Sequence, residues 1–178
     1  ADFELDATDR LLFALASRYE DYSDFGSTFN YKLASRVKAN DHVSIRAAFS
    51  TGFRAPSLHQ QYFSRSSTIF DAEGVAQEEG LFTNESRAAQ LIGIDKLKEE
   101  TSQNISIGST VKKGGFSLTV DAYQITIIDR IILSGAFDDG DDPELASLFS
   151  AAGAGKARFL ANAIDTKTQG IDIVLGYQ

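Results

Sequence analysis

The sequence lacks cysteine, methionine and tryptophan, and it has only two histidines and two prolines. Without cysteine the chain has no disulfide framework, zinc–thiolate site or thiol nucleophile. Its two histidines, His42 and His59, do not have the spacing of metal ligands, and no G-x-S-x-G nucleophile elbow is present. We therefore expect no catalytic residue, no metal, no cofactor and no enzyme activity. The sequence does not exclude a pair of catalytic carboxylates of the glycoside hydrolase kind.

Long apolar runs are also missing. The best candidate, "ITIIDRIIL", contains Asp129 and Arg130 and is too short for a membrane-spanning helix, although this leaves a spanning strand possible. Acidic residues outnumber basic ones by 25 to 17, which disfavours a nucleic-acid partner. The chain has no initiating methionine and begins "ADFELDATDR", which is neither a signal nor a transit peptide. We expect it to be part of a longer polypeptide.

Alternation of apolar and polar residues dominates what is present. This period of two predicts β-strands that each have one apolar face. Short turns connect neighbouring segments: "SDFGS" (23–27), "KANDH" (38–42) and "KKGG" (112–115). The pattern predicts a mainly β protein with an antiparallel, up-and-down meander. The predicted strands are 11–22, 29–37, 42–53, 103–111, 116–124 and 169–177.

Two long connections, 57–97 and 137–158, lack this alternation and are predicted to hold short helices. The cap residues expected for these helices are Asn84 and Gly93 in the first, and Asp142, Pro143 and Gly153 in the second. Two architectures fit strands with one apolar face. One is a soluble antiparallel sheet that buries the face, and the other is a transmembrane barrel that turns it to lipid. Short turns alternating with long loops favour the barrel.

Four motifs then point to a family. "TGFRAPSL" (51–58) closely resembles the end of a barrel strand in TonB-dependent outer-membrane receptors. "LKEETSQNISIG" (97–108), "VDAYQITIIDRI" (120–131) and "NAIDTKTQGIDI" (162–173) resemble three further strands of that family, in the same order. Departures are small: Glu99 replaces a usual proline, Ala161 a common threonine and Ile171 a valine. The motif residues are Gly52, Phe53, Arg54, Pro56, Asp121, Tyr123, Asp129, Arg130, Asn162, Gly170 and Asp172.

The resemblance implies a 22-stranded barrel whose lumen is filled by an N-terminal plug. At about 9–11 residues per spanning strand, residues 1–178 supply six to eight strands, so we expect a segment of the barrel domain without plug or barrel closure. It also implies a receptor in the outer membrane of a Gram-negative bacterium. Such a receptor contacts outer-membrane lipid and binds a scarce small molecule or metal chelate (ferric siderophore, cobalamin or oligosaccharide). Import uses energy delivered by TonB, through parts absent here.

Alternatives remain beside this interpretation. The chain is otherwise a soluble all-β domain that binds a ligand or carbohydrate, or an isolated fragment in a non-native assembly. Phe53 fits either an aromatic girdle at the membrane interface or an ordinary core position. For Arg54 we favour an ion pair with a plug or loop carboxylate over a ligand contact.

The first long loop holds the candidate ligand-binding residues His59, Tyr62, Phe63 and Arg65, because aromatic and arginine side chains on a long loop suit surface capture. Packing of the loop on itself is the simpler interpretation. The second long loop contains "DDGDDPE" (138–144), whose carboxylates resemble part of a calcium ligand set. A solvated acidic loop is favoured there, since Asp142 is also expected to cap a helix.

Overall fold

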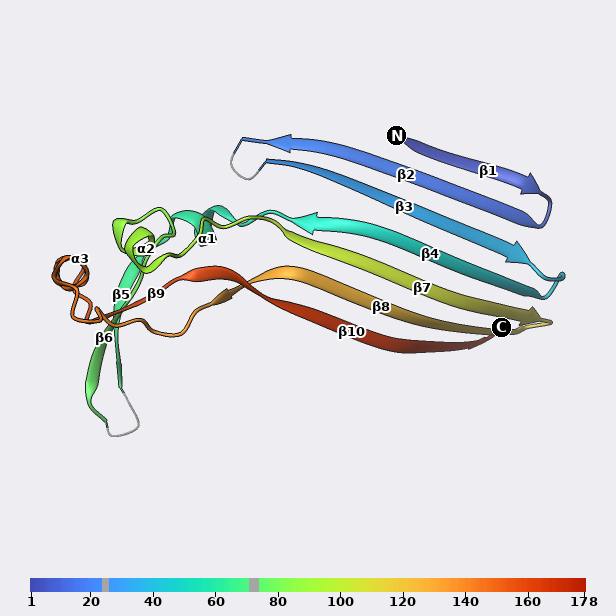
Figure 1. Ribbon diagram of the computed structural model, residues 1–178. Helices are drawn as coiled ribbons and strands as arrows, with labels where there is room; N and C mark the ends of the chain where they lie inside the picture. The colour runs from blue at the N-terminus through green and yellow to red at the C-terminus, as the bar shows by residue number, and fades with distance from the viewer. Residues whose placement is uncertain (24–25, 71–73) are drawn as a thin grey trace. The chain divides into compact units, whose positions relative to one another are not determined.

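Figure 1 shows the chain in a computed structural model that describes residues 1–23, 26–70 and 74–178. Part of the predicted 23–27 turn lies outside these residues. The strands and helices are β1 (Asp2–Thr8), β2 (Leu11–Tyr22), β3 (Gly26–Lys38), β4 (Val43–Arg54), α1 (Leu58–Tyr62), β5 (Arg65–Phe70), β6 (Ala76–Leu81), α2 (Arg87–Ile92), β7 (Glu100–Lys113), β8 (Phe116–Leu133), α3 (Pro143–Ala151), β9 (Lys156–Arg158) and β10 (Leu160–Tyr177).

The chain divides into two compact units. We call the first the sheet unit and the second the loop unit. The sheet unit consists of Ala1–Arg54, Thr101–Ile128 and Asp165–Gln178, and the loop unit of Ala55–Glu100 and Asp129–Ile164.

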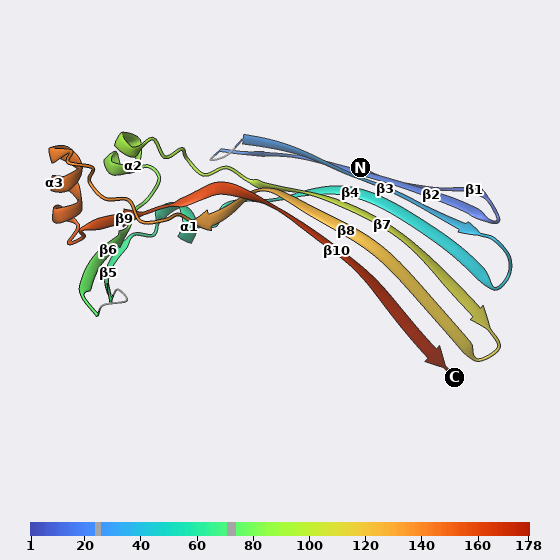
Figure 2. The same ribbon diagram turned by 60° about the horizontal axis from the view of Figure 1, so that its bottom comes forward.

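Seven strands form one sheet in the order β1-β2-β3-β4-β7-β8-β10, and they lie side by side in Figures 1 and 2. The pairs β1–β2, β2–β3, β3–β4 and β7–β8 are antiparallel. Strands β8 and β10 each have 18 residues, far more than the five or six usual in globular proteins. Among the described residues β1 and β10 are the two edges, so the sheet is open. The predicted up-and-down meander is confirmed.

One face of this sheet is apolar and uncovered. Strand register places Leu15 beside Leu33, and Leu33 beside Phe49, on the same side of the sheet. Leu15 and Leu33 are 47% and 48% exposed, and the buried hydrophobic residues of the described chain all belong to the loop unit. A soluble sandwich would bury this face against a second sheet. Among the described residues no second sheet covers this face, and its apolar side chains are exposed.

The sequence pattern located most of the sheet. Segment 11–22 is β2, and the other five predicted strands lie within β3, β4, β7, β8 and β10 apart from one residue at the start of β4. Strand β1 was not predicted, although "DFELDAT" alternates polar and apolar residues over its whole length. Segment 57–97 holds short helices as predicted, α1 and α2, and it also holds β5 and β6, which pair as a hairpin and were not predicted. Their sequences are mostly polar, and they give no clear period-two signal.

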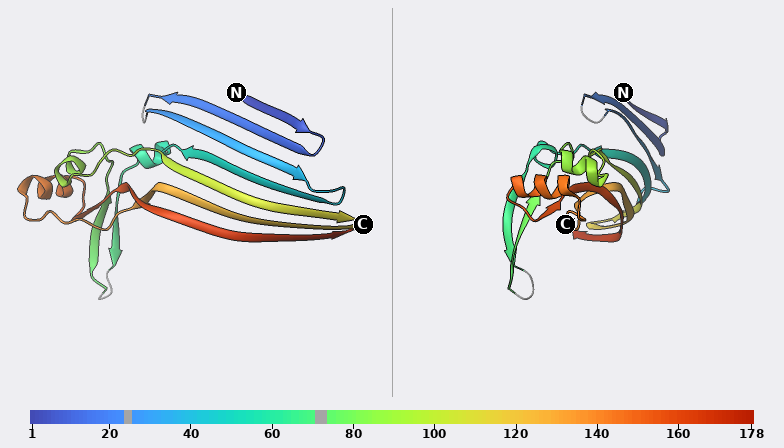
Figure 3. Two further views of the ribbon diagram at one scale, coloured as in Figure 1. Left: turned by 45° about the vertical axis from the view of Figure 1, so that its right-hand side comes forward. Right: turned by 60° about the vertical axis from the view of Figure 1, so that its left-hand side comes forward.

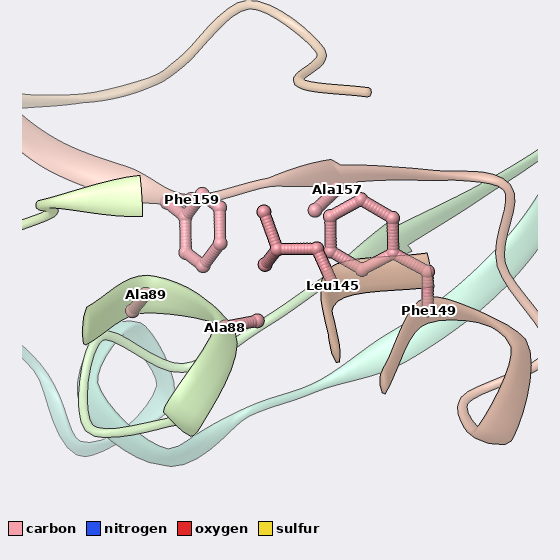
Figure 4. Close-up of a cluster of buried hydrophobic side chains, with 6 residues drawn as sticks. All are labelled: Ala88, Ala89, Leu145, Phe149, Ala157 and Phe159. Carbon is pink, nitrogen blue, oxygen red and sulfur yellow. The ribbon is translucent and has the colours of Figure 1, made fainter. Parts of the chain in front are cut away.

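The loop unit has its own small sheet, in the order β5-β6-β9, in which β6 and β9 are parallel. Helices α2 and α3 contact each other beside it (Figure 3). Their apolar sides meet in what we call the loop core, shown in Figure 4, where Phe149 and Phe159 are almost fully buried. The members of the loop core are Ala88, Ala89, Leu145, Phe149, Ala157 and Phe159.

The helix caps confirm one prediction and correct another. Asp142 caps α3 as predicted, since its carboxylate accepts hydrogen bonds from the Glu144 and Leu145 amides at 2.8 and 3.3 Å. Helix α2 begins two residues later than predicted: its N-cap is Ser86, and Asn84 was the wrong residue. The buried Asn84 side chain instead donates to two carbonyl oxygens, those of Asp95 and Leu160, and so joins two distant segments.

The end of α2 is as predicted: Gly93 ends the helix with a φ of 83°, in the left-handed region that glycine adopts without strain. Within the described residues, each helix is too short or too polar to cross a bilayer.

Phe149→Ala should open the loop core. The side chain is 2% exposed, so we expect a loss of about 3–5 kcal/mol in the local unfolding free energy of α2 and α3. Hydrogen exchange of the α2 and α3 amides measures this quantity. Phe70→Ala is the matched control, because Phe70 is 70% exposed. Equal protection losses in both variants would contradict the assignment of the loop core.

Candidate functional site

Three of the motifs meet in the loop unit, at Asn162. Its side-chain amide donates to the carbonyl oxygens of Lys98 and Asp129, at 2.9 and 2.7 Å, and its Oδ1 accepts from the Lys98 amide at 3.0 Å. Both backbone groups of Lys98 are thus paired with one side chain, as they would be with a neighbouring strand. We call this arrangement the Asn162 junction.

A strained residue lies at the junction. Asp129 has a φ of 57°, a left-handed conformation that aspartate tolerates better than most residues. Its carboxylate pairs with the Lys98 ammonium at 2.9 Å, and this hydrogen bond raises the pKa of Lys98 above its ordinary value. The neighbouring Arg130 is exposed. Of the Asp129-Arg130 pair in the motif, Asp129 takes part in the junction, through its carboxylate and its backbone carbonyl oxygen.

Glu100 adds a buried carboxylate at the start of β7. It is 5% exposed, and its Oε1 accepts a hydrogen bond from the Ile131 amide at 2.8 Å. Lys98 and Glu100 were not selected from the sequence, although both lie in the quoted "LKEE" segment. A buried carboxylate such as Glu100 needs a hydrogen-bond donor; the position of both residues at the start of a motif segment was the available signal.

In the sheet unit, the motif residues pair across strands. Asp121 forms an ion pair with Arg46, whose guanidinium also donates to Thr110 Oγ1 at 3.0 Å. Gly108 lies opposite Asp121 in the register, and a Cβ there would overlap the Asp121 carboxylate. These groups occupy the polar face, opposite the uncovered apolar one. Arg46 was missed because nothing in its own strand marks it.

The motif glycines also make room for side chains. A Cβ on Gly170 would lie 2.5 Å from the phenol ring of Tyr123, so the tyrosine covers the glycine backbone on the neighbouring strand. A Cβ on Gly52 would lie 3.0 Å from Ser102 Oγ. Asp172 is exposed on the edge strand β10.

The "TGFRAPSL" segment ends β4 and begins α1. Phe53 packs edge-on against Tyr22, with ring centroids 5.8 Å apart, and Arg54 is the exposed last residue of the strand. Pro56 is buried, and its carbonyl oxygen accepts from the Gln61 side chain at 3.1 Å. A proline donates no backbone hydrogen bond, so it suits the point where the chain leaves the sheet.

The predicted ligand-binding residues follow immediately. His59 and Phe63 stack on each other with ring centroids 4.1 Å apart, and Tyr62 is 58% exposed. Arg65 begins β5 and lines a different place, a pocket on the small sheet that also includes Arg158. The structure therefore brings two of the four residues into contact.

Arg158 forms the best enclosed ion pair of the loop unit. Its guanidinium donates to both carboxylate oxygens of Glu79, with Nη2 3.2 Å from Oε1, and to the Ser134 carbonyl oxygen at 3.2 Å. The side chains of Arg158 and Glu79 are 33% and 12% exposed. The hydrogen bond from Arg158 holds the pKa of Glu79 below its ordinary value, and the same bond raises the pKa of Arg158.

In the acidic segment 138–144, Asp142 is occupied by its capping role. Across residues 1–23, 26–70 and 74–178, no three His, Cys, Asp or Glu side chains are grouped as a metal site would require.

The long antiparallel strands, the uncovered apolar face and the ion pairs on the polar face define the wall of a membrane β-barrel. The sequence profile described as TonB dependent receptor-like, beta-barrel, matches residues 1–178, so the chain belongs to the TonB-dependent receptor β-barrel family. The predicted family is confirmed. Among curated proteins, no sequence matches this chain.

Solved structures show the same fold. The siderophore receptor PirA from Pseudomonas aeruginosa has a TM-score of 0.74 at 16% identity, covering 98% of this chain and 29% of that one. PirA from Acinetobacter baumannii has a TM-score of 0.70 at 18% identity, with 99% and 24% coverage. The ferric enterobactin receptor PfeA, in complex with BCV-L6, has a TM-score of 0.69 at 15% identity, covering 97% of this chain and 24% of that one. The chain therefore spans less than a third of the length of these receptors.

Asn162→Ala should release the Lys98 segment. Three hydrogen bonds disappear, so we expect a loss of about 1–3 kcal/mol in protection of the Lys98 amide in hydrogen exchange. Asn162→Asp should be at least as damaging, because it sets a carboxylate against two carbonyl oxygens. Asn104→Ala, on the polar face of β7, is the control. Normal protection in Asn162→Asp would refute the donor role of the amide.

Glu79→Gln tests the ion pair through pH. The pKa of folded Glu79 lies below its ordinary value of 4.5, so the stabilisation is complete above that pH and is lost as pH falls through the folded pKa. The stability difference between wild type and variant in urea unfolding should therefore be full at about pH 7 and should shrink as pH falls below 4.5 through the folded pKa of Glu79. Glu144→Gln, in the exposed pair with Arg87, should change little at either pH. A gap independent of pH would exclude this role of Glu79.

Proposed function

We propose that the chain is a segment of an outer-membrane receptor of a Gram-negative bacterium, one that binds a scarce solute and imports it with energy supplied through TonB. A single observation carries this proposal: the family profile covers all 178 residues. Three solved relatives are siderophore receptors, which favours a ferric siderophore as the solute over cobalamin or an oligosaccharide. No covalent chemistry is part of the proposal.

The two faces of the sheet unit have separate roles in this proposal. The apolar face, with Leu15, Leu33 and Phe49, contacts outer-membrane lipid. The polar face, with the Arg46–Asp121 pair, turns toward the lumen, where charged groups remain hydrated or paired. The plug and the rest of the barrel belong to parts outside the 178 residues, and TonB binds through those parts.

The loop unit takes the extracellular role. In this proposal His59, Tyr62, Phe63 and Arg65 lie on the surface that first meets the solute, and the Asn162 junction fixes the base of the loops. The exposed Tyr62 and the stacked His59–Phe63 pair support this assignment, because exposed aromatic side chains supply contact area at low entropic cost.

Fractionated cells offer the first test. An antibody raised against residues 1–178 should detect an outer-membrane band several times larger than 19.3 kDa, with different migration when the sample is not heated. Deletion of the gene should then lower the uptake of ferric siderophore in iron-poor medium. A soluble band near 19.3 kDa would overturn the proposal and favour a soluble all-β binding domain.

Single tryptophans test which face meets lipid, since the chain has none of its own. In the complete receptor in brominated-lipid vesicles, with any tryptophan outside residues 1–178 replaced by phenylalanine, Leu33→Trp fluorescence should be strongly quenched. Lys32→Trp, its neighbour on the opposite face, should keep most of its intensity. Both native side chains are exposed, so both substitutions leave packing largely unchanged. Equal quenching, or quenching at Lys32→Trp alone, would contradict the assigned orientation.

A further inference from the structure

The small sheet of the loop unit has two unlike faces. Gly80 and Ala157 are neighbours on one face, which packs on the loop core: Ala157 is fully buried, and a Cβ on Gly80 would meet the Phe82 ring and Ala154. Side chains alternate along a strand, so the residues directly before and after Gly80 in β6, and before and after Ala157 in β9, lie on the other face.

That other face is cationic. The register places Arg65 beside Leu81, Leu81 beside Arg158, and Glu79 beside Lys156. We call the side bearing these residues the cationic face. Among the described residues, its three basic side chains face one carboxylate, that of Glu79. The loop unit as a whole contains 14 acidic and 7 basic residues. Nearly half of its basic residues thus lie together on one side of three short strands.

A pocket of about 330 Å³ opens on the cationic face. Arg65, Ser67, Glu79 and Arg158 provide its polar lining. Within the described residues, the Arg65 guanidinium takes part in no hydrogen bond or ion pair. Arg158 uses Nε and one N–H of each terminal nitrogen for Glu79 and Ser134, which leaves two of its five N–H donors. The pocket therefore retains positive charge and unused donors.

The rest of the lining is apolar and consists of Ile69, Leu81 and Leu133. Ile69 and Leu133 are 38% and 49% exposed, so they lose water contact only when something fills the pocket. A few directed polar groups on an apolar wall are typical of small-molecule sites, and the volume lies at the small end of their range.

We propose that this pocket binds an oxyanion carried by a small, partly apolar ligand. The anionic group lies between the guanidinium groups of Arg65 and Arg158, and Ser67 supplies a hydroxyl donor. The apolar part of the ligand contacts Ile69 and Leu133. In this way the proposal deepens the receptor function and rests on it, because it names the acidic group of the solute as the feature that the loops recognise.

Glu79 sets the affinity of the pocket. Its carboxylate already occupies two donors of Arg158 and contributes the one negative charge that the described residues place on the cationic face. An incoming anion is repelled by this charge and competes for the same guanidinium. Removal of the Glu79 charge should strengthen binding, and removal of the Arg65 charge should weaken it. If Glu79 and Arg65 only stabilised the fold, removal of their charges would not change ligand binding in opposite directions.

The test is a calorimetric titration of the purified complete receptor in detergent with benzoate, a small carboxylate with one apolar side. Benzyl alcohol is the neutral probe of similar shape, and inorganic phosphate is the oxyanion without an apolar part. We expect benzoate to bind with a dissociation constant on the order of 1 mM, and the other two probes to bind at least tenfold more weakly.

Variants complete the test. Arg65→Gln should weaken benzoate binding about tenfold, and Glu79→Gln should strengthen it several-fold. Lys96→Gln removes the same charge from an exposed side chain outside the pocket and should leave binding unchanged. Hydrogen exchange at α2 and α3 shows whether each variant keeps its fold.

Three results would overturn the proposal: absence of benzoate binding, phosphate binding as tight as benzoate, or equal effects of Arg65→Gln and Lys96→Gln. None of these results affects outer-membrane localisation or uptake in the gene-deletion experiment, so the two proposals fail separately.

Discussion

Backbone hydrogen bonding is the constraint on which the rest of this structure depends. A strand of 18 residues pairs its amides and carbonyls with two neighbours, and this ladder forces successive side chains to opposite faces. One face can then be largely apolar while the other carries Arg46, Asp121 and Tyr123. Where the ladder ends, side chains take the place of the neighbouring strand. Asn162 forms hydrogen bonds with both backbone groups of Lys98, and Glu100 accepts a hydrogen bond from the Ile131 amide.

This constraint also explains what the sequence predicted well. Period-two alternation predicted both ends of β2 correctly and identified the other long strands, because a regular ladder leaves the side chains only two directions. The family motifs marked Asn162, Asp129 and Asp121, all of which make specific contacts. Their partners Arg46 and Lys98 were missed, since a cross-strand contact depends on register, and register is not visible in one strand.

The loop unit was harder to predict because tertiary contacts decide it. Asn84 and Ser86 are both good capping residues, and the choice between them depends on the carbonyl oxygen of Leu160, far along the chain. Strands β5 and β6 have weak patterns of their own and rely on pairing with each other and with β9. The cationic face follows from the same pairing: Arg65 and Arg158 are ordinary surface arginines until three strands align them.

The parallel pairing of β6 with β9 carries a consequence for biogenesis. These two strands lie on either side of β7 and β8 in the sequence, so the small sheet joins segments that emerge at well separated times. Contacts of high sequence separation form late, because the intervening chain must first lose its conformational freedom. The hairpin β7–β8 can form locally, whereas the loop core has to wait for β9. An intermediate in which the β7–β8 hairpin has formed while the loop core and β10 have not is therefore expected during folding.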